Sequence, residues 1–326
     1  MYTEKDISFR SIYVINCVKD RNLRVSTGEL LLEDTCETGG TQKTLTKLPF
    51  QKILALFIVG HITITTPLIE KCKKYNVALV VMKPNFRPVF YWSQTAEANY
   101  LLRAKQYAFD VSSSDVAKAL LYSKLSNQQK LLSNTRRKDP KTIQALEQCE
   151  RGLDLLSTVS DVHVLLGIEG TVARVFFDAY FQDFDWIGRK PRTKRDPLNV
   201  TLDIGYTMLF NYVECFVRMF GFDPYIGVYH RLWFKRKSLI CDLQEPFRAI
   251  IDRTVRTAFH RGQFQEKDFK QRNGEYYLIP SLNGKYMKVF FDSLIPYKTE
   301  IFRYIRDYYR AFMRGHPAEK YPRFKI

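Results

Sequence analysis

The sequence lacks the usual marks of a secreted, zinc-binding or membrane-spanning protein. Its six cysteines are scattered and form no Cys-x-x-Cys pair, so we expect reduced, buried thiols and neither a disulfide framework nor a zinc site. The N-terminal residues MYTEKDISF have no apolar core after a basic start, so no signal peptide is expected. The most apolar long stretch, 200–222, is interrupted by Asp203, Glu214 and Arg218, which argues against a membrane-spanning helix. Together these absences predict a cytoplasmic protein.

Acidic residues are too few to balance the basic ones. The chain has 34 Asp and Glu against 51 Lys and Arg, which gives a formal charge of +17 and a pI near 9.5. Such an excess destabilises a compact state unless a polyanion is close by. Nucleic acid is the first candidate for that polyanion. An anionic membrane surface is the second, and it is the weaker one because no spanning segment is expected.

The length and the aromatic content favour two domains with a sizeable core. The chain has 326 residues, including 24 Phe and 20 Tyr, and contains no internal repeat or low-complexity tract. The first part has short β-branched and aromatic runs between turn residues, which predict a small sandwich or curled sheet. The expected strands are 7–18, 22–26, 29–32, 53–59, 61–65, 77–82 and 87–92, with one short helix at 67–75.

After Trp92 the periodicity becomes helical. The expected helices are 96–109, 115–132, 142–156, 161–186, 197–220, 238–260 and 299–314. Asp196 and Pro197 suit the cap and first position of one helix, and Pro246 must kink or divide another. Asn-Gly pairs at 273–274 and 283–284 predict two turns that flank a hairpin around 275–279. The fold class is therefore α+β, with a small β-rich N-terminal domain (1–93) and a larger, all-α catalytic domain (94–326).

Glu169 is an acid on an apolar helical face. Its neighbours three, four and seven residues away are apolar, so the carboxylate is expected to point into the protein. Burying an unpaired carboxylate is costly, and a cation or a donor network must compensate for it. Arg174 or a neighbouring helix offers a purely structural partner, and taken alone Glu169 fits that interpretation better.

Asp242 and Glu245 are spaced so that they share one face of a helical turn. Two like charges side by side repel each other, and a hard cation such as Mg²⁺ or Mn²⁺, which prefers oxygen ligands, relieves that repulsion. Solvated acids near Lys237 and Arg248 are the simpler alternative. His230 precedes this pair and is followed by several basic residues, which would keep its ring neutral, as a metal ligand must be.

Basic residues gather in three segments, 189–195, 231–237 and the last helix, where Arg303, Arg306, Arg310 and Arg314 form one stripe. Several such segments in a strongly basic chain favour a track for nucleic-acid phosphates. Candidates for phosphate contacts are Arg231, Lys237 and Arg248, which are near the candidate acids in the sequence, and Arg189, Arg192 and Arg195 of the basic loop.

Four ordered motifs carry a resemblance to a known family. They are G-x-E-G at 167–170, D-P-x-N at 196–199 with Gly-Tyr at 205–206, G-x-x-H at 227–230, and S-L-x-x-D-L-x-E-P-F-R at 238–248. Segments 58–68 and 77–83 match as well, whereas the tail beyond Gly262 matches loosely. The chain thus resembles CRISPR-associated protein one, the integrase of CRISPR adaptation, over nearly its whole length.

The resemblance implies a dimerisation role for the N-terminal domain and a catalytic role for the helical one. It implies Glu169, His230 and Glu245 as ligands of Mg²⁺ or Mn²⁺, with Asp242 supporting catalysis. It also implies a homodimer that acts on double-stranded DNA, with a small ferredoxin-like partner, CRISPR-associated protein two, bridging two dimers.

The implied reaction is a transesterification. The 3′-hydroxyl end of a short foreign DNA is joined to the edge of a CRISPR repeat, and the same exchange in reverse cleaves branched DNA. Two alternatives remain: a metal-dependent nuclease or transposon-type integrase of the same fold, and a non-catalytic nucleic-acid-binding scaffold. The scaffold alternative accounts for the charge but leaves Glu169 without an explanation.

Overall fold

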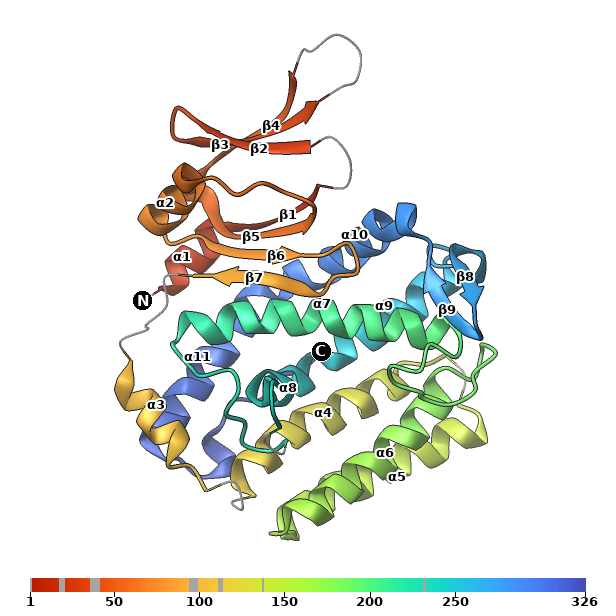
Figure 1. Cartoon of the computed structure of the whole chain (residues 1–326). Helices are drawn as coiled ribbons and strands as arrows, with labels where there is room; N and C mark the ends of the chain where they lie inside the picture. Colours follow the sequence, from red (N-terminus) through yellow and green to blue (C-terminus); the bar gives the residue numbers. More distant parts are fainter. Residues whose placement is uncertain are drawn as a thin grey trace.

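The computed structural model describes residues 2–17, 21–35, 42–93, 99–110, 114–136, 138–230 and 233–326. Strands gather in the N-terminal part and helices make up most of the remainder, in agreement with the α+β prediction (Figure 1). The part predicted to be all-α is not entirely helical, because a two-stranded sheet lies between residues 269 and 278. No helix in these ranges is long and apolar enough to cross a membrane.

The larger sheet has the strand order β1-β5-β6-β7. Neighbours β1, β5 and β6 are parallel, and β7 is antiparallel to β6. Strands β5 and β6 are buried on both faces, which explains their unbroken apolar sequences. The bounds are β1 (Ser11–Cys17), β5 (Ile53–Gly60), β6 (Ala78–Met82) and β7 (Pro88–Trp92).

A second, antiparallel sheet lies beyond the first one. It consists of β2 (Arg21–Ser26), β3 (Glu29–Thr35) and β4 (Gln42–Pro49). Leu23 and Leu30 of this sheet share a core with Leu56 and Ile58 of β5 and with Leu68 of α2 (Thr66–Tyr75). Two sheets therefore pack in layers, in agreement with the predicted sandwich.

The opposite face of the larger sheet packs on helices. Phe57 and Val80 belong to the same core as the long helix α7 (Pro197–Met219), which runs beside the sheet in Figure 1. Asn211 of α7 donates to the Phe86 carbonyl (3.1 Å), and Tyr91 donates to the Cys215 carbonyl (3.1 Å). The predicted division at residue 93 remains a prediction, since one continuous core joins the strands to the helices.

The other helices and strands complete the chain. They are α1 (Glu4–Phe9), α3 (Tyr100–Tyr107), α4 (Asp115–Ser133), α5 (Pro140–Thr158), α6 (Val162–Tyr180), α8 (Ser238–Gln244), α9 (Arg248–His260), α10 (Asn283–Leu294), α11 (Lys298–Arg314), β8 (Phe269–Arg272) and β9 (Glu275–Leu278). The predicted cap at Asp196 is confirmed, because its side chain accepts from the Asn199 N–H at 2.7 Å.

Several element predictions were wrong. Helix α1 and strand β4 were missed, 61–65 is not a strand, and α6 ends at Tyr180 rather than near residue 186. The Asn-Gly pair at 283–284 begins α10 instead of forming a turn, because five buried apolar side chains at helical spacing follow it. The pair at 273–274 does close the β8–β9 hairpin, since both residues adopt positive φ. The sequence also predicts a linker at 93–95 and a cap at Ser113 or Ser114 for the helix that follows, but residues 94, 95 and 113 lie outside the described residues.

Candidate active site

Glu169 is held by α4 and by the segment before α8. Its oxygens accept hydrogen bonds from the Lys124 ammonium and from the Tyr229 hydroxyl (2.5 Å), and its side chain is 16% exposed. The neighbours Leu165, Val172 and Phe176 are buried, which directs this face of α6 inward. The compensating cation is therefore Lys124, whereas the suggested partner Arg174 lines the adjoining cleft.

Glu245 sits where α8 gives way to α9. Pro246 has no N–H to continue the helical ladder, so the chain makes one 3₁₀ turn, Glu245–Phe247, and starts again at Arg248. This agrees with the predicted boundary. The turn is fixed against α4, because Asn127 donates to the Pro246 carbonyl at 3.0 Å.

The Glu245 carboxylate is almost fully buried between two cations. Its Oε1 accepts from Arg248 at 3.0 Å, and its Oε2 lies 2.6 Å from the Lys124 Nζ. Burial alone would raise the pKa of Glu245, but Arg248 and Lys124 outweigh it and bring the pKa to about 2. Glu245 is therefore ionised at neutral pH.

Lys124 bridges the two acids, a role that the sequence analysis did not predict. Its ammonium lies between Glu169 and Glu245 and is 7% exposed. Burial alone would lower its pKa, but the two carboxylates raise it. A signal was available, because Lys124 falls on the same helical stripe as Ala117, Leu120 and Leu121. A charge in an apolar stripe requires a buried partner.

Asp242 positions His230. Its Oδ2 accepts from the backbone N–H groups of Val228 (2.6 Å) and Tyr229 (3.1 Å). Its Oδ1 accepts from the His230 N–H (2.9 Å) and lies 2.6 Å from the His230 Nδ1. We assign the ring proton to Nδ1 from this network, which leaves Nε2 free to bind a cation. With its oxygens engaged in this way, Asp242 orients the ring rather than facing the other two acids.

Gly227 permits this arrangement. A Cβ at this position would lie 2.7 Å from the Asp242 Oδ2 and 2.8 Å from the Ser238 Cβ. Only glycine lets the backbone of 227–230 pass so close to Asp242, which is why the G-x-x-H spacing places three N–H groups on one carboxylate.

The four predicted chemical residues therefore converge, although they do not surround one point. Lys124 connects Glu169 to Glu245, Tyr229 touches Glu169, and the adjacent His230 is held by Asp242. In the described ranges, no group of three His, Cys, Asp or Glu side chains is arranged closely enough to hold a metal ion. The Lys124 ammonium occupies the space between the two glutamates.

The basic residues predicted to contact phosphates are not equally available for binding. Arg189 binds Asp203 (2.5 Å), Lys237 binds Glu214 (2.7 Å) and Arg248 binds Glu245, so these three already hold protein carboxylates. Arg192 and Arg195 are exposed. Arg231 lies outside the described residues. In the last helix, Arg303 and Arg306 pair with Glu4, so the predicted stripe is partly used to hold α1.

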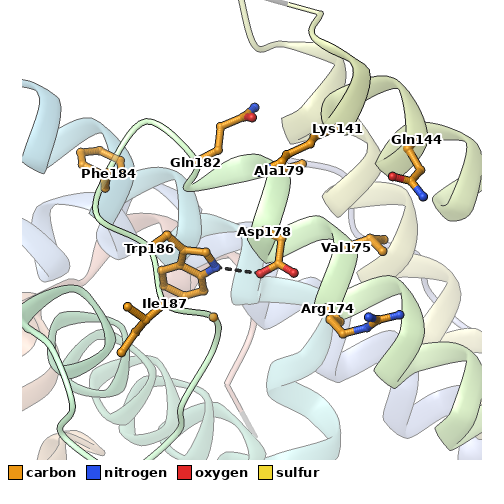
Figure 2. A pocket seen from close by; sticks show the side chains of 11 residues that line it. Lys141, Gln144, Arg174, Val175, Asp178, Ala179, Gln182, Phe184, Trp186 and Ile187 are labelled. Atoms are coloured by element: carbon orange, nitrogen blue, oxygen red, sulfur yellow. Dashed lines mark hydrogen bonds between the residues drawn. The ribbon is translucent and has the colours of Figure 1, made fainter.

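A cleft of about 580 Å³ opens beside Glu169. Its lining is rich in basic side chains and includes Lys124, Arg174, Arg189, Lys190 and Arg248. A second pocket of about 670 Å³ shares Arg174, Asp178 and Gly188 with it. Figure 2 shows this second pocket, in which the Trp186 indole donates to Asp178 (2.9 Å). The two hollows follow α6 away from Glu169.

Comparison with known proteins identifies the family. The sequence profile of CRISPR associated protein Cas1 matches residues 17–291. The chain belongs to the Cas1 family. The CRISPR-associated endonuclease Cas1 1 of Thermodesulfovibrio yellowstonii is 29% identical over 259 residues, which cover 74% of this chain and 80% of that protein. The corresponding protein of Thermus thermophilus is 27% identical over 289 residues, covering 84% of each.

Solved structures share the fold. A Cas1 protein from Thermotoga maritima superposes with a TM-score of 0.74 at 17% identity, over 93% of this chain and 98% of that one. A casposase bound to integration product gives a TM-score of 0.71 at 20% identity, over 97% and 94%. A chain of a Cas6-RT-Cas1–Cas2 complex gives 0.77 at 16% identity, over 98% of this chain and 36% of that one. The predicted membership and fold class are thereby confirmed.

Proposed function

We propose that this protein is a metal-dependent DNA endonuclease and integrase of CRISPR adaptation, which joins the 3′-hydroxyl ends of short foreign DNA to the CRISPR repeat. The observation that carries the proposal is the convergence of Glu169 and Glu245 on one buried cation position, next to a histidine whose tautomer is fixed by Asp242. Membership of the Cas1 family supports the choice of reaction.

The donor atoms of these residues suit a hard divalent cation by their chemistry, although in this structure Lys124 stands between the two glutamates. Two carboxylates and an imidazole nitrogen are the donors that Mg²⁺ and Mn²⁺ accept. Glu245 Oε2 is buried without a well-aligned hydrogen bond, although it faces Lys124. Glu169, Glu245 and the His230 Nε2 would hold the ion, and Lys124 would withdraw. When bound, the metal would polarise a phosphoryl oxygen and stabilise the charge on the leaving oxygen.

The reaction exchanges one phosphodiester for another. The 3′-oxygen of the incoming strand forms a bond to phosphorus while the bond to the leaving 3′-oxygen breaks, and the proton lost by the attacking hydroxyl is balanced by one taken up on the leaving oxygen. The protein supplies a positively charged setting for this step. Arg248, which is 24% exposed and contacts Glu245 and the Tyr206 ring (4.0 Å), would hold the phosphates in position together with the other basic side chains of the cleft.

The assembly is also proposed. A homodimer formed through the β-rich N-terminal domain would act on double-stranded DNA in the cytoplasm. Solved relatives of the fold are complexes named Cas6-RT-Cas1–Cas2, which favours a small Cas2 partner here. Another relative is a casposase bound to integration product, which keeps a transposon-type integrase as the second candidate.

The test is strand transfer of a short duplex with free 3′-hydroxyls into a supercoiled plasmid bearing a CRISPR repeat, with Mn²⁺ or EDTA and with or without Cas2. We expect metal-dependent joining at the repeat edge, and we expect Glu169→Gln to abolish joining while leaving DNA binding nearly intact. Joining at sites unrelated to the repeat would favour the transposon-type integrase. Binding without joining or cleavage in any condition would favour the non-catalytic scaffold.

A further inference from the structure

Two neighbouring aromatic side chains project into solvent directly after the candidate active site. Trp233 is 77% exposed and Phe234 is 83% exposed, which makes them the two most exposed of the large apolar side chains that the structure describes. Single exposed apolar residues are common on protein surfaces, but two adjacent aromatics at this exposure form a stacking surface, and no other aromatic ring among the described residues packs on it.

The active-site elements fix this pair at both ends. His230, which is bound to Asp242, lies three residues before Trp233. Because the chain spans at most about 3.6 Å per residue, the Cα atoms of His230 and Trp233 are no more than about 11 Å apart. Three residues after Phe234, Lys237 is bound to Glu214 (2.7 and 2.8 Å), and α8, which leads to Asp242 and Glu245, begins at Ser238. The Arg236 N–H donates to the Trp233 carbonyl (2.9 Å) and closes a turn. The aromatics are therefore held beside the site.

The charges around the pair suit a polyanion. Lys235 is exposed, and its ammonium lies 5.1 Å from the centre of the Phe234 ring. Within the described residues, neither Lys235 nor Arg236 forms an ion pair with a carboxylate, unlike Lys237 and Arg248. Aromatic rings interleaved with uncompensated cations are the pattern that binds single-stranded nucleic acid, because the bases stack while the cations hold the phosphates.

We propose that Trp233 and Phe234 form a stacking platform for unpaired DNA bases adjacent to the phosphodiester held at Glu169, His230 and Glu245. The platform rests on the proposed DNA substrate and adds a binding site for single-stranded nucleotides outside the catalytic group. It requires unpaired bases, since the faces of bases within a duplex are already stacked on their neighbours. Its ligand is thus a frayed, branched or overhanging strand rather than an intact helix.

The experiment measures DNA binding in EDTA, where binding is separated from reaction. Four ligands are compared: a duplex with a single-stranded 3′ overhang, the same duplex with an abasic overhang, a blunt duplex, and vesicles of anionic phospholipid. Intrinsic fluorescence is recorded for the wild type and for Trp233→Phe, so the difference isolates Trp233 among the three tryptophans. Affinities are measured for a Trp233→Ser/Phe234→Ser double variant and for Tyr100→Ser, an equally exposed aromatic control (72%) on α3.

We expect the overhang duplex to quench the fluorescence of Trp233 and the abasic overhang to leave that fluorescence unchanged. The double variant should bind the overhang duplex about tenfold more weakly and the blunt duplex within twofold of the wild type, whereas Tyr100→Ser should bind both normally. Equal affinity of the double variant and the wild type for the overhang would overturn the platform alone. Quenching by the abasic strand, or a response to vesicles and not to DNA, would also overturn it. Absence of DNA binding by the wild type would overturn the proposed function as well.

Discussion

At the scale of single residues, the central feature is a lysine where a metal ion is proposed to bind. The Lys124 ammonium neutralises two acids that would otherwise repel each other inside the protein. Removing one partner from a buried ion pair is strongly destabilising, because the remaining charge stays buried without compensation. A divalent cation at the same position would supply that compensation.

This leads to a prediction for Lys124→Met. We expect the variant to lose about 3 kcal/mol in free energy of unfolding without metal, since Glu169 and Glu245 lose their shared cation, and to recover most of that loss in Mn²⁺. Urea denaturation with and without Mn²⁺ measures both effects. Lys237→Met is the matched control, because it also removes a lysine from a buried glutamate, Glu214, but lies outside the proposed ligand set. If Mn²⁺ restored the free energy of unfolding in both variants, or in neither, a metal site at the position of the Lys124 ammonium would be contradicted.

Asp252 gives a prediction about pH. Burial raises its pKa from the ordinary 3.8 to about 6, despite the hydrogen bond from Tyr206 and the nearby Arg248 and Arg189. Because the folded-state pKa lies above the unfolded one, the stabilising contribution is fully present below about pH 3.8 and is lost as the pH rises through about 6.

The full difference corresponds to ~3 kcal/mol at 1.36 kcal/mol per pKa unit. We therefore expect Asp252→Asn to gain stability relative to the wild type between pH 4 and 7, by up to that amount. Urea denaturation of both proteins at several pH values tests this. A stability difference that does not change with pH would contradict the raised pKa.

The sequence identified the chemical residues better than their surroundings. The ordered motifs of the family resemblance singled out Glu169, His230, Asp242 and Glu245, whereas helical spacing alone favoured a structural interpretation of Glu169. Lys124 was missed because its partners are 45 and 121 positions away, and a local pattern contains no such distance. The metal-binding and catalytic roles of these residues remain predictions.

At the scale of elements, the site depends on how α7 packs on α9 and α10. Gly205 in α7 has no room for a side chain: an added Cβ would lie 2.5 Å from the Ile251 Cγ2 and 2.6 Å from the Phe290 Cε1. Helix α9 begins with Arg248 and carries Asp252, so a shift of α9 would move one wall of the cleft.

We therefore expect Gly205→Ala to lower the free energy of unfolding by roughly 1–3 kcal/mol through overpacking, although alanine is the better helix former. The control is Gly167→Ala in α6, where an added Cβ meets nothing within 4 Å and a gain of about 0.5–1 kcal/mol is expected. Chemical denaturation of both variants and of the wild type measures these changes in the free energy of unfolding. A stabilised Gly205→Ala would show that this contact does not constrain α9.

Element prediction succeeded where local chemistry is decisive and failed where tertiary packing prevails. The Asp196 cap, the break at Pro246 and the hairpin turn at 273–274 follow from backbone chemistry alone. Strand β4 was missed because its polar sequence, QKTLTKLP, gains strand structure only by pairing with β3. The Asn283 side chain donates to the Pro84 carbonyl (2.9 Å), a contact to the N-terminal strands that no turn rule anticipates.

At the scale of the whole molecule, the net charge of +17 is only partly available to a ligand. Several predicted phosphate-binding arginines are bound to carboxylates within the protein, whereas Arg192 and Arg195 are exposed at the turn between α6 and α7. Exposed cations that replace counterions on DNA give a binding constant that falls steeply with salt.

For the double variant Arg192→Ala/Arg195→Ala, we expect weaker binding to duplex DNA and a slope of log K against log salt that is shallower by about 2. Fluorescence anisotropy at a series of salt concentrations gives the slope. Arg303→Ala is the control, because that guanidinium is paired with Glu4 and its loss should leave the slope unchanged. An unaltered slope in the double variant would remove 192–195 from the DNA-binding surface.

The most direct test of the whole account is the stoichiometry of Mn²⁺ binding, measured by electron paramagnetic resonance on the purified protein. We expect one tightly bound Mn²⁺ per chain in the wild type, and we expect its loss in Glu169→Gln and in Glu245→Gln. Glu33→Gln, which alters a buried, arginine-paired glutamate in the N-terminal sheet, should retain the ion. Undiminished Mn²⁺ binding in Glu169→Gln and Glu245→Gln would contradict the proposed site, and Lys124 would then be a permanent structural partner of two structural acids.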